Sequence, residues 1–295
     1  MDLRTLRYFL AVARDENMTR AAERLRVTQP TLSKALKSLE DELGKKLFVR
    51  HAFNISLTEE GLLLRDRARE LVGLADKMEQ EFRDLDAEGG GELFIGVAET
   101  PQSGRLAREI RAAKDLWPGL RCQLSSGDAE DLAGKLDSGT LDFAVMCTEP
   151  DPRAYESLAF PEADTWGLVM AEDDPLAVKA AVTADDLDGL ALFSTRECWE
   201  RHLPRWCGEP VAELSPEGSF ERFADAVPMV QAGLGCLLAP AGVIAATPSG
   251  GLAFRPLAPA LETPVYLAWK RDRTAAPMAQ RFLARVRASF ESDCE

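Results

Sequence analysis

The chain has 295 residues, of which 46% are hydrophobic and 28% are charged; this composition supports ordinary buried cores and excludes disordered, collagen-like and small disulfide-rich proteins. The length predicts about two domains, or one domain with a small appendage. The net charge of −14 is unevenly divided, because residues 1–57 carry 11 Lys and Arg against 7 Asp and Glu, a net charge of +4, and the remainder carries −18. This asymmetry predicts a small anion-binding module joined to a large acidic domain whose partners are not nucleic acids.

No apolar run of the kind that begins a secreted protein follows Met1, so we expect a cytoplasmic protein. The uncharged stretch 226–254 is long enough to cross a bilayer, but Pro228, Pro240 and Pro248 would break a spanning helix. We therefore expect a buried segment of a soluble domain and no membrane partner. The six cysteines include no CxxC pair and no Cys/His cluster with zinc spacing, so neither a metal nor another cofactor is predicted.

Apolar residues at three- and four-residue steps predict a first helix that Asn17 ends. A second, short helix is expected to be capped by Thr19 and to reach Leu25. A third helix is expected to follow its cap Thr28 and to stop at Gly44. Two helices joined by a tight turn form a helix-turn-helix, a motif that places its second helix in the major groove of DNA.

The outward face of the third helix combines cations that bind phosphate with amides and hydroxyls that read base edges. Each of these side chains alone is explained as well by a solvated helix face. Together, at this spacing, they predict contact with double-stranded DNA. The predicted DNA-binding residues of this helix are Thr28, Gln29, Pro30, Thr31, Ser33, Lys34 and Lys37.

Two short apolar runs, 47–49 and 55–57, flank the polar turn 50–54 and predict a β-hairpin wing. Arg50 is a further predicted DNA-binding residue, because an arginine near a wing can reach a phosphate or the minor groove. The alternative for Arg50 is a solvated side chain. The winged helix-turn-helix domain is expected to span residues 1–58.

Residues 59–88 are predicted to form a linker helix capped by Thr58. Its apolar residues alternate at steps of four and three, as in a coiled-coil seam, and a helix of this length is roughly 40 Å long, too long and too one-sided to stand alone. We expect it to pair with a second subunit; the alternative is packing against the chain's own C-terminal domain. The predicted seam consists of Leu64, Ala68, Leu71, Ala75, Met78, Phe82 and Leu85.

From residue 89 onward, apolar runs of strand length alternate with helical patterns, which is typical of a parallel sheet covered by helices on both faces. The pattern occurs twice and predicts two α/β lobes, one of residues 92–161 plus 265–295 and the other of residues 162–264. The fold class expected for the chain is therefore α/β, with an N-terminal winged helix-turn-helix, a long linker helix and a two-lobed C-terminal domain over residues 89–295.

Ligands of open α/β sheets bind outside the carboxyl ends of the strands, near helix N-termini that favour anions. The residues at those ends are expected to line one cleft, with Arg222 pairing a carboxylate, although helix caps and a surface cation explain the same residues equally well. Glu99 does not fit a simple anion site, so the identity of the ligand stays open. The predicted ligand-binding residues are Glu99, Thr100, Pro101, Ser125, Ser126, Cys147, Thr148, Ser194, Thr195 and Arg222.

Several spaced blocks carry a family resemblance. They are Ala21–Leu25, Thr28–Ser33, Leu39–Gly44, Leu47–Arg50 and Leu57–Gly61, with weaker motifs at Leu141–Ala144, Asp174–Ala177 and Gly233–Gly235. Together they resemble the LysR-type transcriptional regulators over nearly the whole chain. The resemblance implies a periplasmic-binding-protein-like effector domain that holds a small-molecule effector, antiparallel linker helices in a homodimer or a dimer of dimers, an inverted-repeat operator, and RNA polymerase as a further partner. The expected function is a DNA-binding transcriptional regulator whose operator binding is modulated by that effector.

Cys198 and Cys207 suggest an alternative function, because their spacing and location are similar to the redox cysteines of the family's peroxide-sensing branch. On an unbroken helix this spacing corresponds to about 180° of rotation and roughly 13 Å of rise, too far for a disulfide without rearrangement. Pro204 could break such a helix, whereas the flanking tryptophans favour buried structural thiols. The alternative is a thiol-based redox-sensing transcriptional regulator that uses these two cysteines.

An enzyme is not predicted. The two histidines, His51 and His202, lie far apart in the sequence, and neither a GxSxG nucleophile motif nor a phosphate-binding loop occurs. Gly233–Gly235 is a lone turn and not a dinucleotide-binding fingerprint.

Overall fold

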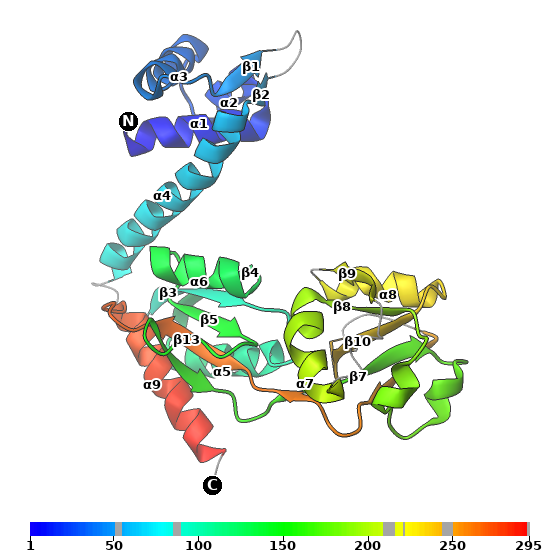
Figure 1. Ribbon diagram of the computed structural model, residues 1–295. Helices are drawn as coiled ribbons and strands as arrows, with labels where there is room; N and C mark the ends of the chain where they lie inside the picture. The colour runs from blue at the N-terminus through cyan, green and yellow to red at the C-terminus, as the bar shows by residue number, and fades with distance from the viewer. Residues whose placement is uncertain (51–54, 85–89, 209–215, 221, 244–249, 294–295) are drawn as a thin grey trace. The chain divides into compact units, whose positions relative to one another are not determined.

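The computed structural model describes residues 1–50, 55–84, 90–208, 216–220, 222–243 and 250–293. The chain divides into an N-terminal unit, which ends near residue 86, and a C-terminal unit that contains nearly all of the rest (Figure 1). The wing turn 51–54 and the predicted end of the linker helix, 85–88, lie outside the described residues.

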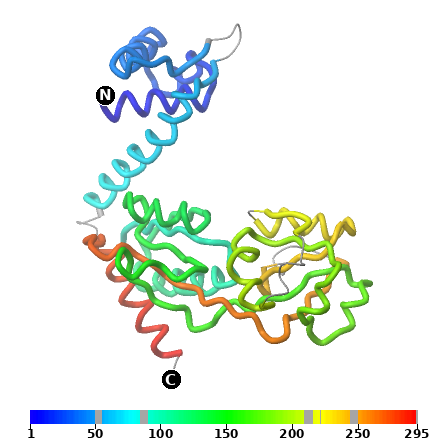
Figure 2. Tube along the Cα trace, viewed as in Figure 1, coloured from blue at the N-terminus to red at the C-terminus, as the bar shows by residue number. Residues whose placement is uncertain are grey.

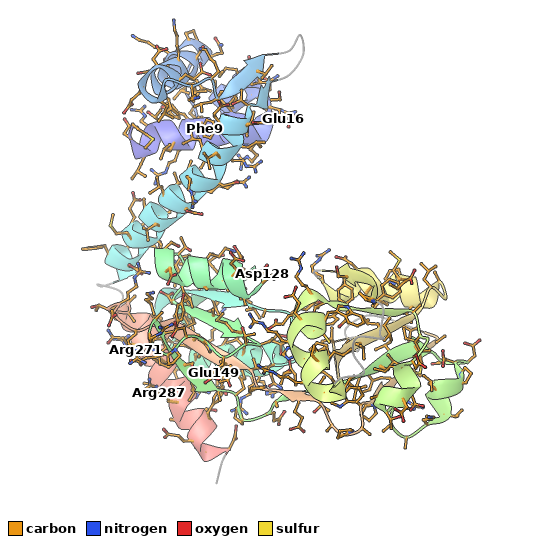
Figure 3. The ribbon with its side chains drawn as sticks, viewed as in Figure 1. Phe9, Glu16, Asp128, Glu149, Arg271 and Arg287 are labelled. Carbon is orange, nitrogen blue, oxygen red and sulfur yellow. The ribbon has the colours of Figure 1, made fainter. Side chains whose placement is uncertain are left out.

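The N-terminal unit is built on a small helical core. Phe9 at its centre is 0% exposed and packs against Phe48, with ring centroids 5.2 Å apart and the rings tilted by 54°. Figure 3 labels Phe9 among the side chains of this unit. The elements are α1 (Leu3–Asp15), α2 (Met18–Arg24), α3 (Gln29–Leu43), the antiparallel hairpin of β1 (Phe48–Arg50) and β2 (Ile55–Leu57), and the long helix α4 (Glu59–Asp84). Their order confirms the predicted winged helix-turn-helix followed by a long helix.

Local side chains set the ends of these helices. Asn17 caps α2, since its side chain accepts hydrogen bonds from two backbone amides of the first turn at 3.0 Å each. The prediction that Thr19 caps this helix was therefore wrong. Thr28 occupies the predicted cap position of α3, but its hydroxyl contacts that of Thr31 at 2.8 Å instead of a backbone amide. Gly44 ends α3 with φ of 65°, as predicted.

Lobe I of the C-terminal unit is a mixed sheet covered on both faces. Its strands lie in the order β4-β3-β5-β13-β6, with β3 parallel to β4 and β5, and β13 antiparallel to β5 and β6. Helices α5 and α9 pack on one face, around Phe282 and Leu106, and α6 packs on the other through Leu132 and Leu136. The elements are β3 (Gly90–Val97), α5 (Ser103–Leu116), β4 (Gly119–Ser126), α6 (Ala129–Ser138), β5 (Phe143–Met146), β6 (Tyr155–Ala159), β13 (Tyr266–Lys270) and α9 (Pro277–Ser292).

Lobe II repeats the plan around a second sheet. Its strands lie in the order β11-β7-β10-β8-β9, with β12 paired to β7; β8 is parallel to β9 and β10, and β7 is antiparallel to β10 and β11. The elements are β7 (Asp164–Ala171), the 3-10 turns η1 (Pro175–Val178) and η2 (Ala184–Leu187), β8 (Leu192–Thr195), the π-helix η3 (Cys198–His202), α7 (Leu203–Cys207), β9 (Pro216–Phe220), α8 (Phe223–Gln231), β10 (Cys236–Pro240), β11 (Leu252–Pro256) and β12 (Glu262–Thr263).

The chain crosses between the lobes twice, from β6 to β7 and back from β12 to β13 (Figure 2). The two crossings lie side by side, because the backbone N–H of Phe160 donates to the carbonyl of Val265 at 2.8 Å. Beside them, the indole N–H of Trp166 donates to the hydroxyl of Thr263 at 2.9 Å. Among the described residues, no helix is both long and apolar enough to cross a membrane.

Two glycines of α4 provide a matched test of how this helix packs. A Cβ at Gly61 would lie 2.2 Å from the backbone oxygen of Leu47, whereas a Cβ at Gly73 would meet nothing within 4 Å. Gly61→Ala should therefore destabilise the protein by about 1 to 3 kcal/mol through overpacking, and Gly73→Ala should stabilise it by about 0.5 to 1 kcal/mol through helix propensity. Urea unfolding measures both changes. Equal effects of the two substitutions would contradict the close approach of α4 to Leu47.

Candidate functional site

The outer face of α3 presents most of the predicted DNA-binding residues to solvent. Leu32, Leu36 and Leu39 are buried on the inner side of the helix, in the core of the N-terminal unit. Because these leucines fix the rotation of the helix, the polar residues between them face outward. The exposed residues are Thr28, Gln29, Pro30, Thr31, Lys34 and Lys37, and Ser33 is half-buried.

The turn before α3 is held by its own backbone. The N–H groups of Arg26 and Val27 donate to the carbonyls of Glu23 and Ala22 at 3.0 Å each, and Arg26 adopts a left-handed φ of 55°. Ala22 is 2% exposed, so α2 lies close against its neighbours. This arrangement gives α3 one fixed orientation in the unit, which a helix that enters the major groove requires.

Glu40 joins α3 to the segment that leads into the wing. Its carboxylate accepts hydrogen bonds from the ammonium of Lys46 at 2.8 Å and from the backbone N–H of Leu47 at 2.9 Å. Burial alone would raise the pKa of Glu40, but these hydrogen bonds bring it below its ordinary value, so the carboxylate is ionised at neutral pH. Arg50 belongs to β1, and its side chain lies outside the described part of the chain.

The predicted seam of α4 is covered by the N-terminal unit near the start of the helix and is exposed further along it. Ala68 is 0% exposed and packs with Leu64 in the core of the N-terminal unit, where α1 lies along α4. Arg7 of α1 forms an ion pair with Asp76 of α4. Part of the periodic pattern therefore arises from packing within the unit itself, and Leu85 lies outside the described residues.

Five exposed large apolar residues of α4 lie on one face of the helix, called here the α4 stripe. Met78 and Phe82 are 52% and 68% exposed, although such side chains bury a large apolar area when they find a partner. Exposed apolar residues that are contiguous on one face of a helix are typical of an interaction surface. The α4 stripe consists of Leu63, Leu71, Leu74, Met78 and Phe82.

In the C-terminal unit, Thr100 and Asp164 join the two lobes. The Thr100 hydroxyl, after β3, donates to the Asp164 carboxyl at 2.6 Å, and the two residues are 5% and 3% exposed. The backbone N–H of Gln102 donates to the Thr100 hydroxyl at 3.1 Å, and its side-chain amide donates to the other Asp164 oxygen at 3.5 Å. Burial raises the pKa of Asp164, and the hydrogen bonds from Thr100 and Gln102 oppose this shift. The Thr100 hydroxyl is thus engaged by the protein itself.

Glu99 joins the lobes at a second point. Its carboxylate accepts a hydrogen bond from the backbone N–H of Phe223, the first residue of α8, at 2.7 Å. Burial raises the pKa of Glu99, while the Phe223 amide and the charge of Arg222 lower it. Arg222 itself pairs with Asp225 at 2.9 Å. The residue predicted to bind a ligand carboxylate therefore lies beside a carboxylate of the protein.

Ser125 and Ser126 lie in a pocket of lobe I between β4 and α5. The pocket has a volume of about 220 Å³ and is mainly apolar. The Ser125 hydroxyl is buried and finds no hydrogen-bond partner among the described residues. The lining residues are Val97, Ser103, Leu106, Ala107, Ile110, Leu124, Ser125 and Ser126.

The other predicted ligand-binding residues have more varied settings. The Ser194 hydroxyl is 0% exposed and donates to the carbonyl of Leu238 at 3.1 Å. The Thr195 hydroxyl accepts from the backbone N–H of Cys198 at 3.2 Å. Both hydroxyls thus serve the fold of lobe II. Pro101, Cys147 and Thr148 are half-buried.

Sequence reasoning missed several carboxylates near the junction of the lobes. Burial raises the pKa of Glu197, Arg201 opposes that shift, and the charge of Asp128 in lobe I adds to it. One Glu197 oxygen is buried without a hydrogen-bond partner in the described part of the protein. Figure 3 shows Asp128 at the start of α6, on the side of lobe I toward lobe II. Asp164 is the buried carboxylate at this junction, and the sequence offered one signal for it: Asp164 stands at the start of an apolar run of strand length.

The two cysteines of the redox alternative lie at either end of an irregular helical segment. Cys198 begins the π-helix, and Cys207 ends α7, which has Pro204 in its first turn. Burial raises the pKa of Cys198 to about 12, with further contributions from Glu197 and Cys207, and it also raises the pKa of Cys207. Both thiols are therefore protonated at neutral pH in this conformation. All of the described cysteines are free.

A third thiol lies close to the junction of the lobes. Burial raises the pKa of Cys147 to about 12; Asp164 and Glu197 add to the shift, and a hydrogen bond with Thr100 opposes it. Among the residues that the structure describes, no three His, Cys, Asp or Glu side chains are grouped closely enough to hold a metal ion.

Comparisons with known proteins match both units. The family model of the bacterial regulatory helix-turn-helix protein, lysR family, matches residues 3–62, and that of the LysR substrate binding domain matches residues 86–291. The DNA-binding transcriptional dual regulator OxyR of Escherichia coli is 30% identical over 82% of this chain and 79% of that protein. The HTH-type transcriptional regulator YtlI of Bacillus subtilis is 32% identical over 75% of this chain and 73% of that protein.

Among solved structures, full-length CbnR in complex with its target DNA is similar with a TM-score of 0.77 and 25% identity, over 98% of this chain and all of that chain. A full-length OxyR variant from Pseudomonas aeruginosa has a similar fold, with a TM-score of 0.59 and 22% identity over 98% of this chain and 99% of that chain. With family models that cover both units and a relative that is 30% identical over four fifths of its length, the chain belongs to the LysR family, whose members are DNA-binding transcriptional regulators with an effector-binding domain and not enzymes.

Proposed function

We propose that this protein binds an inverted-repeat operator as a homodimer and that a small-molecule effector between lobes I and II modulates this binding. The exposed polar face of α3 carries the DNA-binding part of the proposal, since it combines phosphate-binding lysines with base-reading amide and hydroxyl groups. Full-length CbnR, which matches 98% of this chain, has been crystallised with its target DNA. RNA polymerase stays a predicted partner.

Three features support an effector site between the lobes. Thr100, Gln102 and Ser194 are buried at or shortly after the carboxyl ends of β3 and β8, where open α/β sheets bind their ligands. Buried oxygens of Ser125 and Glu197 have no hydrogen-bond partner among the described residues, and buried polar atoms in proteins are nearly always paired. In the described part of the chain, the backbone passes between the lobes at two places, an arrangement that allows a bound molecule to change the angle between them.

A second candidate function is thiol-based redox sensing by Cys198 and Cys207. It is favoured by similarity to OxyR of Escherichia coli and to relatives named hydrogen peroxide-inducible genes activator. Attack of the Cys198 thiolate on hydrogen peroxide would break the O–O bond, form an S–O bond and, with uptake of one proton, release water. Attack by the Cys207 thiol on that sulfur would then break the S–O bond, form the disulfide and release a second water. Burial of Cys198 disfavours the thiolate that the first step needs, so we place the metabolite effector first.

DNA recognition is expected to separate into phosphate and base contacts. Lys37→Ala should weaken binding to operator and random DNA alike and flatten the dependence of affinity on salt, because it removes one counterion-releasing contact. Gln29→Ala should lower preference for operator over random DNA by about 1 to 3 kcal/mol, because a base contact is lost. Fluorescence anisotropy on both DNAs at several salt concentrations measures these effects. A uniform loss for Gln29→Ala would mean that Gln29 reads no base.

Dimerisation is expected to use the α4 stripe. Leu71→Asp and Phe82→Asp place a charge where it would be desolvated without a partner, so both should shift the protein to monomer and weaken operator binding. Gly73→Asp is the matched control, because Gly73 lies about 80° or more around the helix from every residue of the α4 stripe and its Cβ would meet nothing within 4 Å. Sedimentation velocity measures the masses. A dimer retained by both stripe variants would exclude α4 as the interface.

The two modes of sensing are distinguished by one set of variants. A metabolite found by thermal-shift screening should stabilise wild type, Cys198→Ser and Cys207→Ser equally, because it binds only the folded state. Ser125→Ala should weaken it by roughly tenfold with little loss of stability, since this hydroxyl has no described protein partner. Mass spectrometry after brief peroxide treatment tests the alternative. A Cys198–Cys207 disulfide at low peroxide, with a changed DNA footprint, would favour the redox function instead.

A further inference from the structure

The N-terminus of α8 has no capping side chain from its own segment. Its cap residue is Arg222, which makes no side-chain cap hydrogen bond, and a guanidinium has no acceptor atom to offer. The first backbone N–H groups of a helix have no partner within the helix and require an acceptor from elsewhere. They also carry the positive end of the helix dipole, so that acceptor is best an anion.

Glu99 supplies this acceptor from the other lobe. Its carboxylate accepts from the N–H of Phe223 at 2.7 Å, across 124 residues of sequence, and hydrogen bonding to the N–H of Ala224 further lowers its pKa. Arg222 adds a positive charge beside it. The carboxylate of lobe I thus occupies the position at α8 that a bound anion would take.

The position of Glu99 is fixed by its neighbours in the chain. Ala98 donates its backbone N–H to the carbonyl of Val145 at 3.0 Å, which extends the pairing of β3 with β5. Thr100 on the other side is held by Asp164 at 2.6 Å. Because the backbone on both sides of Glu99 is fixed, its carboxylate loses little conformational entropy when it binds the N-terminus of α8. It therefore binds there as an intramolecular ligand with a high effective concentration.

We propose that Glu99 is a built-in anion ligand of α8 and the specificity-determining residue that denies this anion site to carboxylate effectors. The proposal rests on the effector site proposed above and names the chemistry of its ligand. Asp225 already opposes the charge of Glu99, so a second anion would meet two carboxylates here. The effector therefore meets this part of the site with an uncharged or cationic group.

Carboxylate rescue of the full-length protein tests the proposal. Glu99→Ala removes the ligand and should lower the midpoint of thermal unfolding by roughly 2 to 4 °C, because α8 loses its cap. Sodium acetate, compared with sodium chloride at equal ionic strength, should restore part of this loss in a saturable way, because free acetate then fills the vacated site. The wild type should show no saturable acetate effect, since Glu99 occupies the site.

Two further variants serve as controls. Glu99→Gln keeps an oxygen acceptor of the same length without the charge, and acetate should not rescue it because the site is still filled. Glu291→Ala removes an exposed carboxylate of α9 and reports any general effect of acetate on stability. Glu99→Gln also provides a folded variant if Glu99→Ala does not fold.

Each outcome has a definite meaning. Saturable rescue confined to Glu99→Ala supports the proposal. An unchanged midpoint for Glu99→Ala, no rescue by acetate, or equal acetate stabilisation of wild type or Glu99→Gln would overturn it. The experiment contains neither DNA nor effector, so failure of the proposed regulatory function would leave its result unchanged, and the reverse also holds.

Discussion

The arrangement of the two lobes depends on a carboxyl group that cannot be left without partners. Asp164 is 3% exposed at the first residue of β7, and a buried carboxyl with no hydrogen bonds would cost at least about 1 to 3 kcal/mol. Its donors, Thr100 and Gln102, both come from the loop after β3 in lobe I. Satisfying one residue of lobe II therefore fixes the loop of lobe I that also carries Glu99 and directs it to α8.

The same junction bears on the proposed effector site. Besides the backbone crossings, hydrogen bonds join the lobes: Glu99 accepts one from the first residue of α8, and Thr100 donates one to the first residue of β7. Hydrogen bonds of this kind can be exchanged for bonds to a ligand at little net cost, whereas a continuous apolar core between the lobes would resist separation. The buried cores instead lie within each lobe, and this leaves the angle between the lobes to polar contacts.

The sequence predicted what depends on periodicity and missed what depends on tertiary partners. Leu32, Leu36 and Leu39 recur at helical spacing, so the rotation of α3 and its exposed polar face followed directly. Strand-end hydroxyls look alike in sequence, yet Ser194 bonds to Leu238 within lobe II while Ser125 keeps an unpaired oxygen among the described residues. Whether such a hydroxyl is paired depends on residues far away in the sequence. The partner of Ser194, for example, is 44 residues away. The seam of α4 shows the same limit, because a heptad pattern indicates that a helix face is apolar but not what covers it. Here the part of the seam that includes Ala68 packs in the core of the N-terminal unit.

The segment that holds Cys198 combines an irregular backbone with a protected thiol. A π-helix is a rare local geometry, here closed by a bond from the Leu203 N–H to the Cys198 carbonyl, and Pro204 then removes one backbone donor from the start of α7. At Cys198 the backbone thus departs from the regular hydrogen bonding of an α-helix. The thiol of this residue is neutral, because burial, Glu197 and Cys207 all raise its pKa. Redox sensing would thus require this segment to open before the reaction with peroxide, whereas the proposed metabolite site needs no ionised thiol.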